Sequence, residues 1–258
     1  MIHRKSAAEI AIMQEGGRCV AKVLKRMKEV VRPGITTMDI AREADMMARA
    51  LDVVPAFKGY NGYPAVICVS VNEEVVHGIP SSKRILMDGD IVGLDFGALY
   101  NGFYADAAVT LPVGETPPET RRLLEVTREA LFIGIEAAQV GNRIGDISQA
   151  VQSHVEDNGY SVVKVFVGHG IGRNLHEEPQ VPNYGESQWG ARIKKGMTLA
   201  IEPMVNAGTD GVHVLDDGWT AVTSDGSLSA HFEHTIAVTE NGPKILTIEE
   251  TGREESGN

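Results

Sequence analysis

The sequence predicts an α+β fold in which one order of helices and strands occurs twice. Two amphipathic helices precede a group of strand-like segments, and a second pair of helices precedes a second group. The strings GDIVGLD (89–95) and GMTLAIE (196–202) each run from a glycine to an acid. We call the separation between Gly89 and Gly196 the repeat offset. It predicts two related halves with pseudo-two-fold symmetry.

A second match supports this duplication. Ile40 and Ile147, which open the second helix of each pair, are separated by the same repeat offset. Each match is short enough to arise by chance, but matches at corresponding places favour a duplicated domain. We expect one domain over 1–258, with internal halves at about 1–113 and 114–250, and a site between such halves would draw residues from both.

The first half begins with two helices. Ser6 and Glu9 form a capping box, and apolar residues then follow one helical face until the string RPG (32–34) ends the helix. The string TTMD (36–39) starts the second helix. Its inner face is expected to carry Ile40, Ala44, Met47 and Leu51.

A second pair of helices opens the second half. Thr116 is expected to cap the third helix, with Pro117 at its first helical position. The fourth helix follows the string VGNRIGD and ends at Asn158-Gly159. Between the two pairs lie strand-like segments at 65–71, 89–99 and 103–113.

Composition and charge limit the class of protein. The formal net charge of −11 argues against a nucleic-acid-binding surface. Cys19 and Cys68 lie far apart and form no disulfide or CxxC pattern, which indicates a reducing compartment. The first residues contain no signal-peptide core, and no apolar run approaches the length of a membrane span. We expect a cytoplasmic protein with no membrane and no nucleic-acid partner.

Two aspartates interrupt the hairpin that Asn101-Gly102 predicts. Aspartate is disfavoured in strands, and burying an unpaired carboxylate is costly. If the turn is at Asn101-Gly102, Asp106 faces Gly97, and Asp95 shares that face, about 7–8 Å away at the backbone. Two such anions repel unless one is protonated or a cation lies between them. The stretch by itself leaves open whether this face is solvent-exposed or holds a cation.

Three further residues have metal-binding chemistry in apolar settings. His169 lies in VFVGHGIG, Glu202 in TLAIEPMV and Glu233 in AHFEHTIAV. Together with the two aspartates they offer four carboxylates and one imidazole, which suit Mn, Fe, Co or Zn, and four anions balance two divalent ions. The set contains no thiolate, which argues against a structural zinc site. Two metals sharing a water would form a hydrolase site.

Other histidines are less informative by themselves. His77 and His176 stand in the loop-like strings VVHGIPSS and NLHEEPQ, where both a structural and a functional role are open. His231 shares the strand face of Glu233, whereas His234 lies on the opposite face, where packing or support of the site is expected.

Five long strings resemble a known family. The chain resembles the type I methionine aminopeptidases, of the short bacterial kind, in the A branch of peptidase family M24, and the resemblance covers nearly the whole chain. It implies the pita-bread fold: two α+β halves about a pseudo-two-fold axis, with a dinuclear metal site between them. The strings are YNGYPAVICVSVNEEVVHGIP (60–80), LDFGALYNGFYADAAVT (94–110), VGHGIGRNLHEEPQVPNYG (167–185), MTLAIEPMV (197–205) and DDGWTAVTSDGSLSAHFEHT (216–235).

The resemblance implies a role for each metal-binding candidate. Asp106 and Glu233 would bridge two divalent ions, Co, Mn, Fe or Zn. Asp95 would chelate one ion, and His169 and Glu202 would bind the other. The free amino group of the substrate would bind near Asp95 and a metal, which limits action to N-termini.

It also implies three catalytic residues. His77 would hydrogen-bond the scissile amide, and His176 would stabilise the carbonyl oxygen as it becomes tetrahedral. Glu202 would carry the proton from the nucleophilic water to the leaving amine.

The implied methionine pocket contains rings and a thiol, which suit a thioether. Cys68 without the resemblance is simply a small buried hydrophobe. Leu175 stands where the family usually has Phe, and His231 stands where Gln is common, so the pocket wall and the surroundings of Glu233 differ from the family pattern. The pocket residues would be Tyr60, Tyr63, Cys68, Leu175 and Trp219 together with His77 and His176.

The resemblance predicts removal of the initiator methionine from nascent chains that have a small second residue. The enzyme would meet the ribosome transiently and act as a monomer. One alternative is a related Xaa-Pro aminopeptidase or prolidase, which usually carries a large additional N-terminal domain. Others are a catalytically inactive pita-bread binding module and a two-metal phosphate-ester hydrolase. The last would need basic residues near the metals, and these strings contain few.

Overall fold

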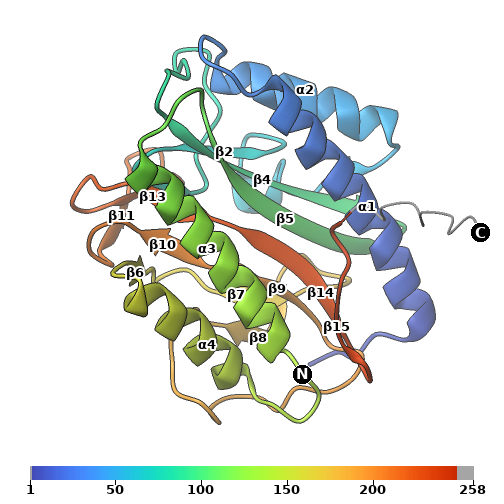
Figure 1. Ribbon diagram of the computed structural model, residues 1–258. Helices are drawn as coiled ribbons and strands as arrows, with labels where there is room; N and C mark the ends of the chain where they lie inside the picture. Colours follow the sequence, from blue (N-terminus) through green and yellow to red (C-terminus); the bar gives the residue numbers. More distant parts are fainter. Residues whose placement is uncertain (1, 249–258) are drawn as a thin grey trace, which may run out of the picture.

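Nine strands form the central sheet, and the computed structural model describes residues 2–248 (Figure 1). Their order across the sheet is β1-β4-β5-β14-β9-β7-β8, with β2 paired to β4 and β15 paired to β14. In that order the seven span Val54–Pro55, Ile91–Tyr100, Phe103–Pro112, Glu233–Thr239, Thr198–Ile201, Gly168–Gly170 and Glu177–Val181, while β2 and β15 span Cys68–Val71 and Gly242–Ile245. The two halves of the chain meet in this sheet, where β5 pairs antiparallel with β14.

Two three-stranded sheets contain the other strands of the described region. One has the order β13-β10-β6, and the other has the order β11-β12-β3. These strands span Ser229–His231, Met204–Asn206, Ser161–Val162, Val212–Val214, Ala221–Thr223 and Glu74–Val76, in the order just given.

Helices α1 to α4 lie on one side of the central sheet (Figure 1). Apolar residues of α1 and α2 pack with those of β2, β4 and β5 in one buried cluster. Those of α3 and α4 pack mainly with β9 and β14 in another, so each half has a core of its own. The helices span Ala7–Val30, Thr37–Ala50, Pro118–Ala137 and Ile144–Asp157, and a short 3₁₀ turn spans Tyr60–Gly62.

The predicted repeat is present in the elements themselves. Helices α2 and α4 have the same length, and their first residues are separated by the repeat offset, as are the first residues of the short strands β1 and β6. The same offset separates the starts of β4 and β9, and the last residues of α1 and α3. The division at 113/114 stays a prediction, and residues 249 and 250 of the predicted second half lie outside the described residues.

Most helix boundaries follow the predicted signals, and one does not. The capping box of Ser6 and Glu9 is confirmed. The prediction for Thr116 was wrong by one residue: α3 begins at Pro118, with Pro117 as the N-cap. A proline at the first helical position loses no hydrogen bond, because that N–H has no partner inside the helix. The Thr116 hydroxyl instead accepts a hydrogen bond from Arg121 Nε at 3.3 Å.

The inner face of α2 also differs in part from the prediction. Ile40 and Ala44 are buried, but Met47 and Leu51 are only half-buried. Ala41 and Ala48 are buried in the same helix. The buried stripe of α2 is therefore centred on its alanines, whose small side chains let the helix approach its neighbours closely.

The hairpin is confirmed with its predicted register. Asn101 and Gly102 have positive φ angles of 46° and 80° and form the turn between β4 and β5. Gly97 faces Asp106 as expected. Within residues 2–248, no helix combines the length and the apolar character that crossing a bilayer requires.

Candidate metal centre

Strand register places a first row of acids across the central sheet. Asp95 on β4 lies opposite Ala108 on β5, and Ala108 lies opposite Glu233 on β14. Glu202 directly follows β9, whose register with β14 continues the row beyond Glu233. The methyl group of Ala108 leaves space between the flanking carboxylates.

A second row lies two residues further along the strands. Asp106 faces Gly97 on one side, and the Thr235 hydroxyl donates a 2.9 Å hydrogen bond to its Oδ1 on the other. Ala200 lies opposite both Thr235 and His169. Because residues two apart along a strand point to the same side, both rows share one face. Backbone pairing thus gathers the four carboxylates and the imidazole.

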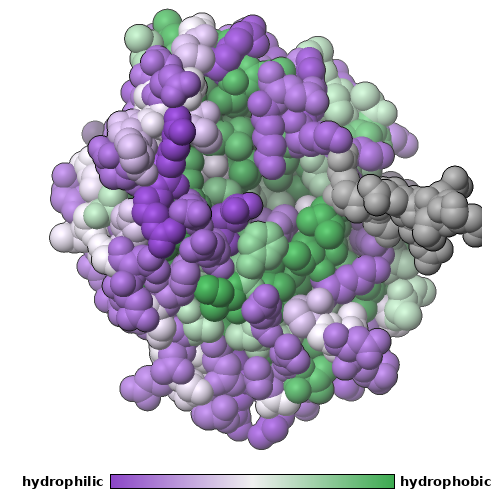
Figure 2. All heavy atoms as spheres, viewed as in Figure 1, coloured by the Kyte–Doolittle hydropathy of each residue, from purple (hydrophilic) through white to green (hydrophobic). Residues whose placement is uncertain are grey.

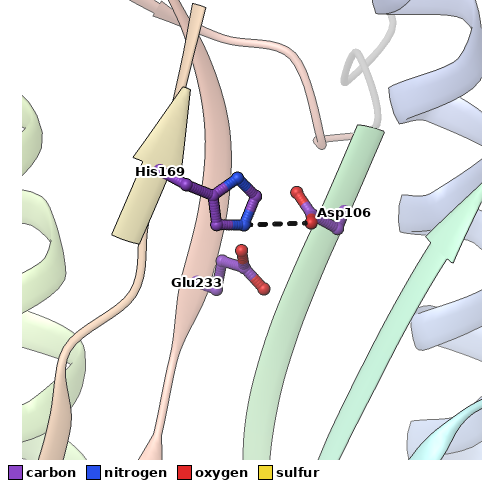
Figure 3. A group of neighbouring side chains, drawn as sticks. All are labelled: Asp106, His169 and Glu233. Carbon is purple, nitrogen blue, oxygen red and sulfur yellow. Dashed lines mark ion pairs between the residues drawn. The ribbon is translucent and has the colours of Figure 1, made fainter. Parts of the chain in front are cut away.

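The imidazole of His169 is oriented towards the acids. Its Nδ1 lies 2.9 Å from the carbonyl oxygen of Gly170, to which it donates. Its Nε2 lies 3.7 Å from Oδ2 of Asp106 and 3.5 Å from Oε1 of Glu202. One ligand atom from each of His169, Asp106 and Glu233 lies within 4.8 Å of the other two, and the three side chains converge in Figure 3.

The carboxylates lack the positive charge that their ionised forms require. Burial, and after it the negative charge of the neighbouring acids, raises the pKa of Asp95, Glu202 and Glu233 well above the usual range. Burial also raises the pKa of Asp106, to about 6. Oδ1 of Asp95 is buried and has no hydrogen-bond partner in the part of the chain that the structure describes. Bound divalent cations would remove all of these costs, and hard oxygen donors with one imidazole suit them.

A cavity of about 240 Å³ opens onto this cluster. All twelve residues that the sequence predicted for the site line it. They are Tyr60, Tyr63, Cys68, His77, Asp95, Asp106, His169, Leu175, His176, Glu202, Trp219 and Glu233. The cavity also has six lining residues outside that set: Phe57, Asn61, Val76, Phe166, Val167 and His231.

Two histidines of the cavity are neutral at physiological pH. Burial lowers the pKa of His77 and of His176 to about 4 in each case. Nδ1 of His176 lies 2.7 Å from the hydroxyl of Tyr60, which holds the ring in place. The His77 ring packs edge-on against Phe166 at 5.3 Å, and its backbone has a positive φ of 62°. A neutral imidazole can donate one hydrogen bond without adding charge to the site.

Aromatic rings and a thiol form the apolar wall of the cavity. Tyr63 and Trp219 contact each other edge-to-face at 5.1 Å. The Tyr63 hydroxyl donates to the carbonyl oxygen of Gly78 at 2.8 Å, so the ring cannot turn away. Burial raises the pKa of the Cys68 thiol, so it stays protonated and apolar. Such a wall suits a polarisable, unbranched side chain.

Sequence reasoning missed two rings of this wall. Phe57 packs so closely on Gly97 that a Cβ at Gly97 would lie 2.9 Å from the Phe57 ring. Phe166 lies shortly before His169, in the apolar string VFVGHGIG. Proximity of both phenylalanines to the quoted strings was the available signal. Leu175, by contrast, is fully buried in a cluster that also includes Phe57 and Tyr60.

The two faces of β14 are separated as predicted. Glu233 lines the metal-side cavity, whereas His234 lines another cavity of about 350 Å³ between α1 and α3. Apolar side chains are visible in that region, between the polar outer surfaces of the helices (Figure 2). His234 Nδ1 lies 2.8 Å from the Thr247 hydroxyl, so this histidine supports packing.

Comparison with known sequences places this geometry in a family. The model of metallopeptidase family M24 matches residues 11–240. Methionine aminopeptidase 1 of Bacillus subtilis is 51% identical over 247 residues, covering 96% of this chain and 99% of that protein. Methionine aminopeptidase of Clostridium acetobutylicum is 48% identical over 248 residues, with the same coverage of both chains.

Solved structures share the fold over the same length. A crystal structure of methionine aminopeptidase from Thermotoga maritima matches with a TM-score of 0.95 and 51% identity, covering 96% of this chain and 100% of that one. Prolidase from Pyrococcus furiosus matches with a TM-score of 0.77 and 25% identity, covering 96% of this chain but 66% of that one. These matches confirm the pita-bread fold. The chain therefore belongs to metallopeptidase family M24 and, within it, to the methionine aminopeptidases.

Proposed function

We propose that the protein removes the N-terminal methionine from nascent proteins and peptides by metal-dependent hydrolysis, with a preference for a small second residue. One observation carries the proposal. A single cavity of about 240 Å³ is lined both by the acid and imidazole cluster and by rings and a thiol that suit a thioether. Membership of the methionine aminopeptidases supports the same reaction.

Five side chains are proposed to hold two divalent ions. When bound, the ions polarise the scissile carbonyl and acidify a water so that it is nucleophilic near neutral pH. The unpartnered Oδ1 of Asp95 and the convergence of Asp106, His169 and Glu233 support this assignment. The ions are Co, Mn, Fe or Zn, because all four accept imidazole and carboxylate ligands.

The remaining polar residues are proposed to handle the peptide bond and its protons. Glu202 takes a proton from the attacking water and gives it to the leaving amine. His77 hydrogen-bonds the scissile amide. His176 donates to the carbonyl oxygen as negative charge develops on it, because Tyr60 engages Nδ1 and leaves Nε2 for the substrate.

The substrate is held at its first residue. Its free amino group binds beside Asp95, which restricts the reaction to N-termini. The methionine side chain lies against Tyr60, Tyr63, Cys68, Leu175 and Trp219. The edge-to-face contact of Tyr63 with Trp219 supports a rigid pocket.

The alternatives from the sequence are less well supported. A Xaa-Pro peptidase has the same fold, but the match to a prolidase reaches 25% identity against 51% for the methionine aminopeptidases. A catalytically inactive binding module has no need for five ligand side chains gathered on one sheet face. A phosphate-ester hydrolase would need cations beside the acids, and no lysine or arginine lines the cavity among the described residues.

We also propose that the enzyme works in the cytoplasm as a monomer and contacts the ribosome transiently. Both cysteines are free thiols, which suits a reducing compartment. Its substrates are chains that are still emerging during synthesis. Sedimentation with purified ribosomes, and molar mass in solution by light scattering, test these two points separately.

The deciding experiment is methionine release from the peptide Met-Ala-Ser. Metal-stripped protein is assayed alone and with added Mn, Fe, Co or Zn, and Ala-Pro-Ala serves as the matched substrate for a Xaa-Pro peptidase. We expect metal-restored release from Met-Ala-Ser and none from Ala-Pro-Ala. Folded protein that releases no methionine with any metal would contradict the proposal and favour the binding module.

A further inference from the structure

One polar atom in the cavity has no task in the reaction described so far. The side chain of His231, the last residue of β13, is 5% exposed, and its Nε2 is buried without a hydrogen-bond partner among residues 2–248. A buried imidazole nitrogen left unsatisfied costs stability. Asp95 has a comparable unsatisfied atom, for which the proposed cations would account, whereas a neutral imidazole with a proton on Nε2 needs an acceptor.

The backbone of His231 is fixed from two sides. The Thr110 hydroxyl on β5 donates to its carbonyl oxygen at 2.8 Å and accepts from its N–H at 2.9 Å. Met204 on β10 lies opposite it in the sheet register. These two strands adjoin the residues of the metal cluster, since β5 carries Asp106 and β10 begins shortly after Glu202. The backbone of His231 is therefore held beside the metal cluster, and its imidazole lines the same cavity as the metal-binding residues.

Among the described residues, Glu202 carries the one carboxylate within 4.0 Å of this imidazole nitrogen. Nε2 of His231 lies 4.0 Å from its Oε2, and Nε2 of His169 lies 3.5 Å from its Oε1. The first distance exceeds a hydrogen bond by about 1 Å, so a hydrogen bond requires the carboxylate to turn towards His231. The backbone of Glu202 is held separately, because Asn183 Nδ2 donates to its carbonyl oxygen at 3.0 Å. The carboxylate of Glu202 can therefore turn towards His169 or towards His231 while its backbone stays in place.

We propose that His231 is a positioning residue for Glu202: its Nε2–H donates to Oε2 and holds the carboxylate in the orientation that carries the proton from water to the leaving amine. The inference rests on the proposed function. The proposed hydrogen bond satisfies the unpaired Nε2. The two hydrogen bonds between Thr110 and the His231 backbone hold the residue in place for it. His231 acts through Glu202 and makes no contact with the reacting atoms.

The test uses two amide side chains of different length at position 231. In His231→Gln the amide nitrogen replaces Nε2 in position, whereas in His231→Asn it ends near the former Nδ1 and cannot reach Oε2. Both variants place an uncharged amide at this position, and their melting temperatures show whether folding is matched. His231→Leu removes the donor altogether. His154→Leu is the control, because His154 lies on α4 and does not line the cavity.

The measurements are kcat and KM for Met-Ala-Ser, metal content per chain and melting temperature. We expect His231→Asn and His231→Leu to lower kcat about 10- to 100-fold, the effect of one hydrogen bond to a charged group. We expect KM and metal content to stay near wild type, and His231→Gln to keep kcat within about threefold. The control variant should match wild type in kcat, KM and metal content.

Two results would overturn the proposal. If His231→Asn keeps the kcat of His231→Gln, the reach to Oε2 has no role. If kcat falls only in proportion to lost metal, His231 serves metal retention and not the orientation of Glu202. Failure of the proposed function is distinct from both, because wild-type protein would then release no methionine under any condition.

Discussion

The two halves of the molecule share their helical scaffold but contribute differently to the cavity. Helices α2 and α4 have the same length and are related by the repeat offset, and β1 and β6 keep that offset. The first half supplies Asp95 and Asp106 from one long hairpin. The second half supplies its ligands from β7, from the end of β9 and from β14.

This difference shows which parts of a duplicated domain are constrained. The second helix of each pair keeps its length and spacing because its apolar stripe packs against the sheet, whereas α1 and α3 keep only the spacing of their last residues. A metal ligand needs only to lie in one of the two rows of residues across the central sheet, on the face that lines the cavity. Asp95 and Glu202 are the one pair of ligands that keeps the repeat offset. His213, which the same offset relates to Asp106, does not line the cavity.

Asp106→Asn gives the largest expected effect. Of the two acids that the first half supplies, Asp106 lies closer to the His169 imidazole of the second half. Loss of one negative charge should lower metal content and reduce methionine release to below about a thousandth of wild type. The side chain keeps its size, so the melting temperature of the metal-free protein should change little. Release assays, metal analysis and thermal unfolding measure the three quantities. A variant with full activity would remove Asp106 from the site.

Lys5→Met tests how the N-terminal segment is joined to the second half. Lys5 Nζ lies 2.5 Å from Glu177 Oε2, and the two side chains are only 5% and 6% exposed. Lys5 passes so close to Gly172 that a Cβ there would clash with its Cε. Removing one partner of a buried ion pair leaves a charge uncompensated, so the free energy of unfolding should fall by about 3–5 kcal/mol.

The double variant Lys5→Met with Glu177→Gln is the control for this ion pair. It removes both charges and should recover most of the lost stability in urea unfolding. Because Glu177 follows His176 directly, kcat should fall in the single variant and return in the double one. Additive losses of stability would show that the pair is not coupled.

The pH dependence of stability tests the gathered acids as a group. Their pKa values are raised in the folded protein, so without metal the folded state holds protons that the unfolded state has released. Such stability is present at low pH and is lost as pH rises through the folded-state pKa values. Above about pH 7.5 the histidines are almost fully neutral in both states, because an ordinary imidazole has a pKa near 6.5, and they contribute little. For each carboxyl group that stays protonated in the folded state, metal-free protein should therefore lose about 1.4 kcal/mol of unfolding free energy per pH unit above this point.

Added divalent metal should remove that slope, because the bound cations keep the acids ionised. Urea unfolding between about pH 7.5 and about pH 8.5, with and without metal, measures it. A flat profile in the metal-free protein would show that the carboxylates are ionised without a cation.

Leu175→Phe is expected to have the smallest effect. Leu175 belongs to the second half, but the rings of Phe57 and Tyr60 from the first half pack in the same cluster. An additional ring should therefore change KM for methionine peptides by no more than about threefold. The ratio of kcat/KM for Met-Ala-Ser and Leu-Ala-Ser measures the change. A tenfold gain in selectivity would mean that the first half does not compensate for the missing ring.

Local signals determined much of this protein. Capping residues, the Asn-Gly turn and apolar periodicity located the helices and the hairpin, because each depends on a few neighbouring residues. The start of α3 was missed by one residue, since two consecutive prolines leave the choice of first helical position to packing. The quoted strings identified the family and so the twelve predicted residues that line the cavity.

The tertiary structure alone decided how those residues meet. Register across five strands, set by the cores of both halves, brings four acids and an imidazole to one face, and no local pattern specifies such distant pairings. It also decided that Asp95 and His231 are buried with unsatisfied atoms, which depends on what surrounds them. The sequence by itself determined the elements and the chemistry available, whereas long-range packing determined which groups share the cavity and what each of them lacks.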